Sequence, residues 1–207
     1  MTGAERGRAL VAPLLLAALA LGGCTTSPPS DVNNICKIFR EKDDWYDDAD
    51  DSRKRWGSPI PVMMAIMHQE SRFRAKAKPP RKKILWVIPG PRPSNSYGYT
   101  QALEETWEIY QRDAGNYGAD RDDFGDSIDF IGWYNHQSYR RSGIKKDDPY
   151  HLYLAYHEGH GGFNKRSFKS KQWLKDVAKK VSRQSSRYAT QLQGCEEDLK
   201  DDGWWPW

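Results

Sequence analysis

The sequence lacks the large basic excess that is typical of proteins that bind nucleic acids. Its 32 lysines and arginines are nearly balanced by 28 aspartates and glutamates, which leaves a formal net charge of +4 at pH 7. We therefore expect no nucleic-acid partner. A small basic excess does suit a protein that works on the surface of an anionic polymer.

The chain also lacks an apolar segment that is long enough to span a membrane. Its N-terminal apolar run, residues 10–21, follows two arginines, Arg6 and Arg8, and ends in two glycines just before Cys24. A basic start, a short apolar stretch and small residues at a cleavage point are the features of a secretory signal peptide. The sequence therefore predicts that residues 1–23 are a signal peptide.

Cysteines are scarce, with 3 in the whole chain. The segment Leu-Gly-Gly-Cys24 resembles the lipobox of bacterial lipoproteins, which implies a lipid on Cys24 that anchors the protein to a membrane. Thr25 rather than an aspartate follows, and in lipoproteins this implies the periplasmic face of the Gram-negative outer membrane. Residues 24–34 would then be the lipidated cysteine and a polar tether. The alternative is an ordinary signal peptide followed by an unrelated cysteine.

Once Cys24 carries lipid, two thiols remain, those of Cys36 and Cys195. The compartment implied by the signal peptide is oxidising, and two cysteines in such a compartment favour a disulfide. The pairing would tie the first helix of the domain to its last helix. Two unpaired, buried thiols are the alternative.

Aromatic residues are abundant, with 9 tryptophans and 11 tyrosines, although the mean hydropathy is only −0.88. Large amphipathic rings build a core and also line grooves that bind sugars. A chain of 207 residues is long enough for one compact domain with its own core.

The segment 58–73 predicts an apolar helix that carries one acid. Ser58 is a suitable helix cap, and prolines at positions 59 and 61 are tolerated in a first turn. The helical spacing of the apolar side chains indicates a core helix. Its members are Val62, Met63, Ala65, Ile66, Met67 and Phe73.

Glu70 lies on the apolar face of this helix, seven residues after Met63, four after Ile66 and three before Phe73. Loss of water around a carboxylate favours its protonated form, so Glu70 is a candidate general acid near neutral pH. The alternative is a half-exposed glutamate that forms an ion pair with Arg72 or Arg74.

Three short motifs occur in one order along the chain. Glu70-Ser71 ends the apolar helix, residues 96–101 read Ser-Tyr-Gly-Tyr-Thr-Gln, and residues 155–159 read Ala-Tyr-His-Glu-Gly. They resemble the Glu-Ser, Gly-Leu-Met-Gln and Ala-Tyr-Asn-Ala-Gly motifs of the lytic transglycosylases, a soluble-type branch of the lysozyme-like superfamily. The resemblance covers roughly residues 55–190.

The resemblance implies a mainly α domain with the goose-type lysozyme fold, which we place at residues 35–200. Residues 76–95 are an insertion, since family members join the first two motifs by a shorter connection. The insertion contains an apolar run bounded by prolines, which indicates a short strand or hairpin. Residues 201–207 are a tryptophan-rich tail, for which sugar stacking, lipid contact and docking on the domain are alternatives.

The resemblance also implies the site. Glu70 would be the general acid and base that cleaves the β-1,4 bond between N-acetylmuramic acid and N-acetylglucosamine of peptidoglycan, without a cofactor. The hydroxyl of Tyr156 would reach its carboxyl. The expected substrate contacts are Ser71, Gly98, Tyr99, Gln101, Tyr156 and His157. A lip formed by the insertion would add Trp86 for sugar stacking and basic residues for peptide carboxylates.

Periodicity predicts further helices. They cover residues 35–55, residues 102–115, a segment from 127 to 139 capped by Ser127, a segment from 150 to 156 capped by Asp147 or Asp148, and residues 167–194 with Trp173 on the apolar face.

Three alternatives to a transglycosylase remain. A hydrolytic muramidase would use Glu158 or an aspartate to activate water, and a lipoprotein without activity would only bind peptidoglycan. A metal-dependent hydrolase would use His151, His157 and His160 with Glu158. The spacing of His157 and His160 is one residue short of the zinc-protease pattern, and the glycines around them break a helix. We therefore expect no metal.

Overall fold

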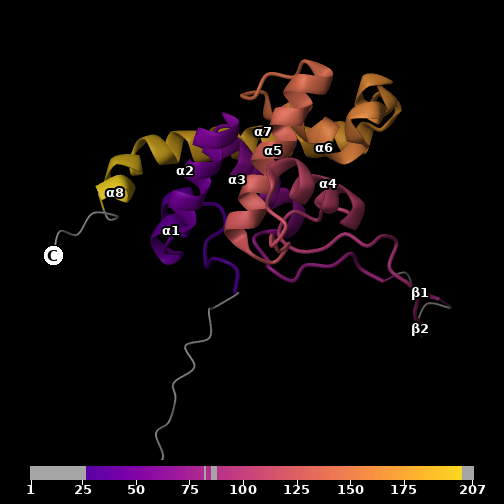
Figure 1. Cartoon of the computed structure of the whole chain (residues 1–207), viewed down its shortest axis with the longest axis horizontal. Helices are drawn as coiled ribbons and strands as arrows, with labels where there is room; N and C mark the ends of the chain where they lie inside the picture. Colours follow the sequence, from indigo (N-terminus) through magenta and orange to yellow (C-terminus); the bar gives the residue numbers. More distant parts are fainter. Residues whose placement is uncertain (1–26, 82, 85–87, 202–207) are drawn as a thin grey trace, which may run out of the picture.

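The computed structural model describes residues 27–81, 83–84 and 88–201, and the domain is mainly helical, as the sequence predicts. The elements are α1 (Ile35–Glu41), α2 (Trp45–Trp56), α3 (Ile60–Ser71), β1 (Lys83–Ile84), β2 (Ile88–Pro89), α4 (Glu104–Ala114), α5 (Phe124–Ser142), α6 (Pro149–Asn164), a 3-10 turn (Ser167–Ser170), α7 (Gln172–Gln193) and α8 (Glu196–Asp201). Figure 1 shows their arrangement.

Helix α3 is the centre of the domain. Every side chain from Val62 to Met67 is buried, because α3 contacts α2, α5, α6 and α7. A helix that is apolar on all sides is stable in water only when other elements surround it. The apolar composition of this helix therefore accounts for the way in which the other helices cover it.

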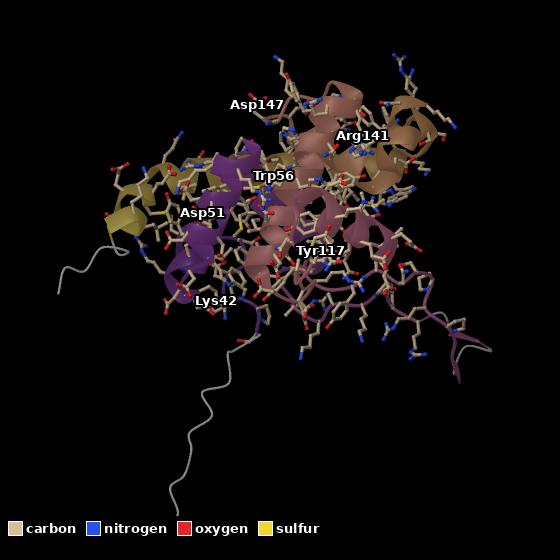
Figure 2. All side chains as sticks on the ribbon, viewed as in Figure 1. Lys42, Asp51, Trp56, Tyr117, Arg141 and Asp147 are labelled. Carbon is tan, nitrogen blue, oxygen red and sulfur yellow. A yellow bond between two sulfur atoms is a disulfide. The ribbon has the colours of Figure 1, made fainter. Side chains whose placement is uncertain are left out.

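Helices α2 and α5 pack closely. A Cβ on Gly132 of α5 would lie 2.4 Å from the Ser52 hydroxyl of α2, so this position requires glycine. One half-buried carboxylate links the neighbouring helices: Asp129 accepts hydrogen bonds from Trp56 Nε1 at 2.6 Å and from the Tyr110 hydroxyl at 2.9 Å. Figure 2 shows Trp56 where α2 meets α5.

Several predicted helix ends are wrong. The Ser58 hydroxyl does not cap α3; it accepts a hydrogen bond from Asn135 at 2.9 Å, and Pro59 holds the cap position. Helix α5 begins at Phe124 with Asp123 as its cap, so Ser127 is a buried residue of the first turns. The side chain of Asp148 does cap α6, as predicted.

The segment predicted as one N-terminal helix is two helices. Asp44 lies between α1 and α2 with a φ of 65°, in the left-handed region that ends a helix. At the other end of the prediction for α3, Phe73 is buried but lies beyond the helix, because Arg72 and Phe73 both have positive φ. Glu70 and Phe73 therefore do not lie one helical turn apart on the same face of α3.

The hairpin predicted in the insertion is present. Strands β1 and β2 pair antiparallel, with Ile84 opposite Ile88, and project from the helical body (Figure 1). Trp86, Cys24 with the predicted signal peptide, and the tryptophans of the tail lie outside the described residues. Within the described ranges, no helix has the length and apolar character needed to cross a membrane.

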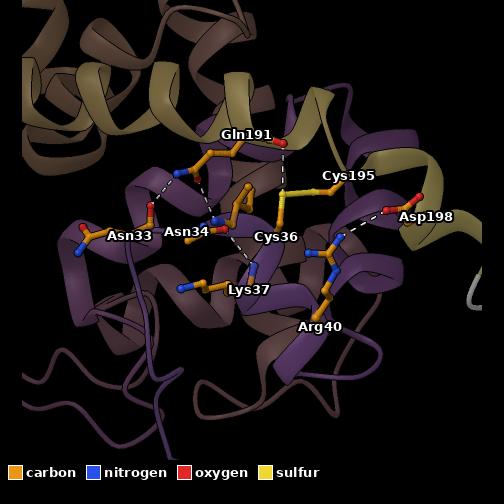
Figure 3. The surroundings of a disulfide bond; sticks show 9 residues. Asn33, Asn34, Cys36, Lys37, Arg40, Gln191, Cys195 and Asp198 are labelled. Atoms are coloured by element: carbon orange, nitrogen blue, oxygen red, sulfur yellow. Dashed lines mark hydrogen bonds and ion pairs between the residues drawn. A yellow bond between two sulfur atoms is a disulfide. The ribbon is translucent and has the colours of Figure 1, made fainter.

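The predicted disulfide joins Cys36 of α1 to Cys195, between α7 and α8, over a sequence separation of 159 residues. Figure 3 shows the polar contacts that surround it. The Gln191 side chain accepts a hydrogen bond from the Ile35 backbone at 3.0 Å and donates one to the Asn33 carbonyl at 3.2 Å. The two ends of the domain are therefore joined both covalently and by hydrogen bonds.

We predict that replacing both cysteines, Cys36→Ser with Cys195→Ser, lowers the free energy of unfolding. Closing so long a loop stabilises the folded state by at most about 5 kcal/mol, since the open chain has more conformations to lose. Chemical denaturation of the variant and of the native protein measures the difference. A reducing agent should destabilise the native protein and leave the variant unchanged. Two free thiols among positions 36 and 195 in the denatured, non-reduced protein would contradict the pairing.

Candidate active site

A cleft of about 600 Å³ lies beside α3. This volume is in the range of clefts that bind small ligands or a few sugar units. One wall comes from the segments 79–80 and 94–106, and the other comes from α5 and α6. The lining residues are Glu70, Pro79, Pro80, Ser94, Ser96, Gln101, Ala102, Leu103, Thr106, Phe130, Tyr134, Tyr156, His157, Glu158 and Gly159.

Glu70 occupies the last turn of α3 and reaches this cleft. Two residues with left-handed backbone, Arg72 and Phe73, follow directly, with φ values of 53° and 58°. This conformation is unfavourable for residues other than glycine and persists where the surroundings enforce it. Here the Phe73 side chain is fully buried in the core, with its ring centre 5.9 Å from that of Trp45. The sharp chain reversal allows α3 to end at the cleft.

The carboxyl of Glu70 is poorly hydrated. Burial raises the pKa of Glu70 to about 7, and a hydrogen bond from the Tyr153 hydroxyl opposes this rise. Burial is the stronger of the two effects, so a large fraction of the carboxyl is protonated at neutral pH. The side chain can therefore give up a proton and then hold the resulting negative charge beside a hydroxyl donor.

Tyr153 is a site residue that the sequence analysis missed. It lies on α6 one turn before Tyr156, so both rings face the same side of that helix. Tyr153 is 4% exposed, and both burial and the Glu70 carboxyl raise the pKa of its hydroxyl, which therefore stays a donor. The sequence could have indicated Tyr153, because it lies three residues before Tyr156 and so on the same face of the predicted helix.

Tyr156 has a different partner from the one implied by the resemblance. Its hydroxyl donates a hydrogen bond of 2.8 Å to the Thr100 carbonyl, and Thr100 is buried. Burial raises the pKa of Tyr156, and the nearby Glu70 carboxylate adds to the rise. Tyr156 lines the cleft and links α6 to the opposite wall, while Tyr153 bonds the carboxyl.

The backbone turns tightly at Gly98, which has a φ of 76°. A Cβ at this position would lie 1.8 Å from the Arg121 carbonyl oxygen, so only glycine fits. The amide of Gln101 donates hydrogen bonds of 2.9 Å to the carbonyls of both Ala77 and Gly98. Gln101 thus lines the cleft and also holds its wall together.

Three predicted substrate contacts do not line the cleft. Ser71 is 1% exposed, and its hydroxyl donates to the Met67 carbonyl one turn earlier on α3. Gly98 is buried against Arg121. Tyr99 points into the core, where its ring meets Trp45 edge-on at 5.8 Å. Their roles in the structure are to support the wall and the end of α3.

The second carboxylate of the cleft, Glu158, is fully engaged by partners. Lys171 donates to its two oxygens at 2.7 and 3.0 Å, the Ser167 hydroxyl donates a further hydrogen bond, and His157 Nδ1 lies 3.1 Å away. Burial alone would raise the pKa of Glu158, but these partners outweigh it and lower the pKa to about 2. A carboxylate held in this state is a weak base.

The histidines considered as metal ligands face separate partners. His151 Nδ1 lies 2.7 Å from the Asp148 carboxylate, and His160 Nε2 lies 3.0 Å from the Ser138 hydroxyl. Gly159, with a φ of 69°, kinks α6 between His157 and His160. In the part of the chain that the structure describes, no group of three histidine, cysteine or acidic side chains is placed to hold a metal ion.

Trp173 is not part of the core of α7, contrary to the prediction. Its side chain is 55% exposed, while the next residue, Leu174, is fully buried. The Trp173 ring meets His157 edge-on at 5.1 Å, so it lies beside the cleft residue His157. Further along α7, Val181, Tyr188 and Leu192 are buried, as helical spacing predicts.

The chain matches the model of a known protein family. Residues 12–195 match the family model described as transglycosylase SLT domain, which covers most of the chain. A search of curated proteins finds no match.

We predict that Glu70→Gln stabilises the protein, and increasingly so between pH 4.5 and pH 7. In this window the folded state retains the Glu70 proton that the unfolded chain releases, so the stability of the native protein falls as pH rises. The neutral glutamine removes this dependence. The variant should be more stable by up to about 3 kcal/mol at pH 8, and similar to the native protein at pH 4. Urea denaturation at both pH values measures this.

Glu108→Gln is the matched control, because Glu108 is exposed on α4 and should show no such pH dependence. If Glu70→Gln destabilises the protein at pH 8, then Glu70 is a partner in a stabilising ion pair, and the proposed poor hydration is wrong.

Proposed function

Because the chain belongs to the transglycosylase SLT domain family, we propose that it is a peptidoglycan lytic transglycosylase in which Glu70 is the single general acid and base. It would cleave the β-1,4 bond between N-acetylmuramic acid and N-acetylglucosamine and leave 1,6-anhydro-muramyl ends. The observation that carries this proposal is the contrast between two cleft carboxylates. Burial raises the pKa of Glu70 to about 7, so that both its acid and its base forms are present at neutral pH, whereas its partners keep Glu158 charged.

In the first step, protonated Glu70 donates its proton to the bridging oxygen while the bond from that oxygen to C1 of the muramyl sugar breaks. The leaving glycan departs with a neutral hydroxyl, and positive charge develops at C1. The acetamido group of the same sugar stabilises this charge, so the protein needs no carboxylate nucleophile. Glu70 is now ionised and accepts the hydrogen bond of Tyr153.

In the second step, ionised Glu70 removes the proton of the muramyl 6-hydroxyl. The O6 atom forms a bond to C1, which closes the 1,6-anhydro ring and regenerates protonated Glu70. A pKa near 7 suits both steps, because the group must give a proton and then take one at the same pH. Gln101, Tyr156 and His157, which line the cleft, are the proposed substrate contacts.

The surroundings of Glu158 argue against the hydrolytic alternative. A muramidase of that kind needs a second carboxylate that is free to take a proton from water. Lys171, Ser167 and His157 occupy both oxygens of Glu158, and its low pKa makes it a poor acceptor. The same ion pair instead fixes the part of α6 that carries His157.

We also propose that a lipid on Cys24 holds the domain at the periplasmic face of the outer membrane. The lipobox-like segment and Thr25 support this, and both precede the described part of the chain. A tether of about ten residues would place the cleft close to the membrane surface and within reach of the peptidoglycan layer.

We predict that purified protein releases muropeptides with 1,6-anhydro ends from isolated sacculi, and that Glu70→Gln lowers the rate by about 10²- to 10⁴-fold. The glutamine keeps the shape of the side chain but has no proton to transfer at neutral pH. Mass spectrometry identifies the ends, because an anhydro end is lighter by one water than a reducing end. Circular dichroism checks that the variant is folded, and Glu108→Gln serves as the control for activity.

Each alternative has its own outcome. Reducing ends would identify a hydrolytic muramidase, and binding to sacculi without release of muropeptides would identify a binding protein. Loss of activity with a chelator would identify a metal-dependent hydrolase. An unchanged rate for Glu70→Gln would remove the mechanism.

We predict that Cys24→Ser abolishes lipidation, because serine lacks the thiol that carries the lipid. Expressed in a Gram-negative host, the variant should move from the membrane fraction to the soluble fraction and lose the mass of the lipid. Thr25→Ser, which retains the cysteine, is the control. A Cys24→Ser protein that remains in the membrane with unchanged mass contradicts the anchor.

A further inference from the structure

A second pocket adjoins the cleft. It has a volume of about 340 Å³ and is lined by Lys78, Arg92, Ser94, Asn95, Ser96, Tyr97 and Arg121. Ser94 and Ser96 also line the cleft, so a strip of a few residues separates the two hollows. A substrate that occupies the cleft can therefore reach the pocket with a side branch.

Three cations of this pocket are held in place by the protein. The guanidinium of Arg121 donates hydrogen bonds of 3.2 Å to the carbonyls of Asn95 and Ala102. Arg92 donates to the Pro79 carbonyl. Lys78 Nζ lies 5.1 Å from the centre of the Tyr97 ring, and Arg121 lies 5.5 Å from the same centre.

The pocket has no acidic lining residue among the described residues. Within those residues, none of the ion pairs includes Lys78, Arg92 or Arg121. The nearby Asp122 carboxylate accepts a hydrogen bond of 2.9 Å from the Tyr97 hydroxyl, at the edge of the ring. Three like charges that share one pocket repel each other, and a bound anion relieves this repulsion.

We propose that this pocket binds a carboxylate of the peptide that branches from the muramyl sugar. The inference deepens the proposed function, on which it rests, by naming peptide-bearing glycan as the preferred substrate. Peptidoglycan peptides carry free carboxylates, and arginine matches the planar carboxylate with paired hydrogen bonds. The shared wall at Ser94 and Ser96 places the pocket where a branch of the bound glycan would arrive.

The insertion contributes to this pocket. Lys78 and Arg92 lie on its two arms, before β1 and after β2, whereas Arg121 comes from the loop before α5. The sequence predicted that basic residues of the insertion meet peptide carboxylates. The residues of the insertion that take this role in the proposal are Lys78 and Arg92, because they share a pocket with Arg121.

The test compares two substrates in binding and in cleavage. The substrates are glycan strands with intact peptides and the same strands after an amidase has removed the peptides. Binding is measured in a Glu70→Gln background, so that the strands are not cleaved. Lys78→Met with Arg92→Gln removes two charges at similar size, and it spares Arg121, which supports the backbone.

The double change should weaken binding of peptide-bearing strands about five- to tenfold, since two charge-assisted contacts are lost. Binding of stripped strands should not change. In the active enzyme, KM for peptide-bearing strands should rise by a similar factor while kcat stays the same. Lys180→Met with Arg183→Gln, which removes two exposed charges from α7, is the matched control and should change neither substrate.

The inference is wrong if the protein with its pocket unaltered binds peptide-bearing and stripped strands with equal affinity. It is also wrong if the double variant loses affinity equally for both substrates, or if the control variant weakens binding as much as the double variant does. Failure of the proposed function is a separate result: no release of muropeptides by the active protein. Because binding is measured without turnover, either idea can fail while the other stands.

Discussion

The removal of water from one carboxyl group is the physical constraint on which the site depends. Glu70 lies in the last turn of a helix whose central side chains, Val62 to Met67, are all buried, and the chain reverses sharply at Arg72 and Phe73. The reversal brings the acid to the edge of the core, where it is accessible from the cleft but poorly hydrated. The tyrosines of α6 complete its surroundings with a hydroxyl donor at Tyr153. The packing that forms the core therefore also sets the surroundings of Glu70.

The two carboxylates of the cleft have different surroundings. Apolar neighbours raise the pKa of Glu70, and a lysine, a serine and a histidine lower that of Glu158. Pairs of acids with opposite shifts commonly divide acid–base work from electrostatic or structural work. Here the charged member anchors α6 to Lys171 and positions His157 at the cleft. The replacement of the asparagine and alanine of the related motif by His157 and Glu158 thus adds a structural ion pair between α6 and Lys171.

Much of the fold could be predicted, because it depends on local patterns. The apolar helix, the paired cysteines and the hairpin between prolines are all visible as spacing or composition. Helix ends were less predictable, since Ser58 and Ser127 have the chemistry of caps but are used by buried contacts instead. Trp173 was assigned to the wrong face for a similar reason: an aromatic residue at nearly the right spacing resembles a core residue.

The sequence by itself determined that one acid sits at the end of a buried helix, because helical periodicity is a property of neighbouring residues. Tertiary structure alone decided which groups surround that acid and its neighbours. Tyr153 and Glu70, like Lys78 and Arg121, come from segments far apart in the chain, and the partners of Glu158 are brought to it by the turn that follows α6. Such contacts arise only when helices pack, and a shift of one residue in the packing face changes them. The position of the acid therefore follows from the local sequence, whereas the groups that surround it follow from tertiary packing.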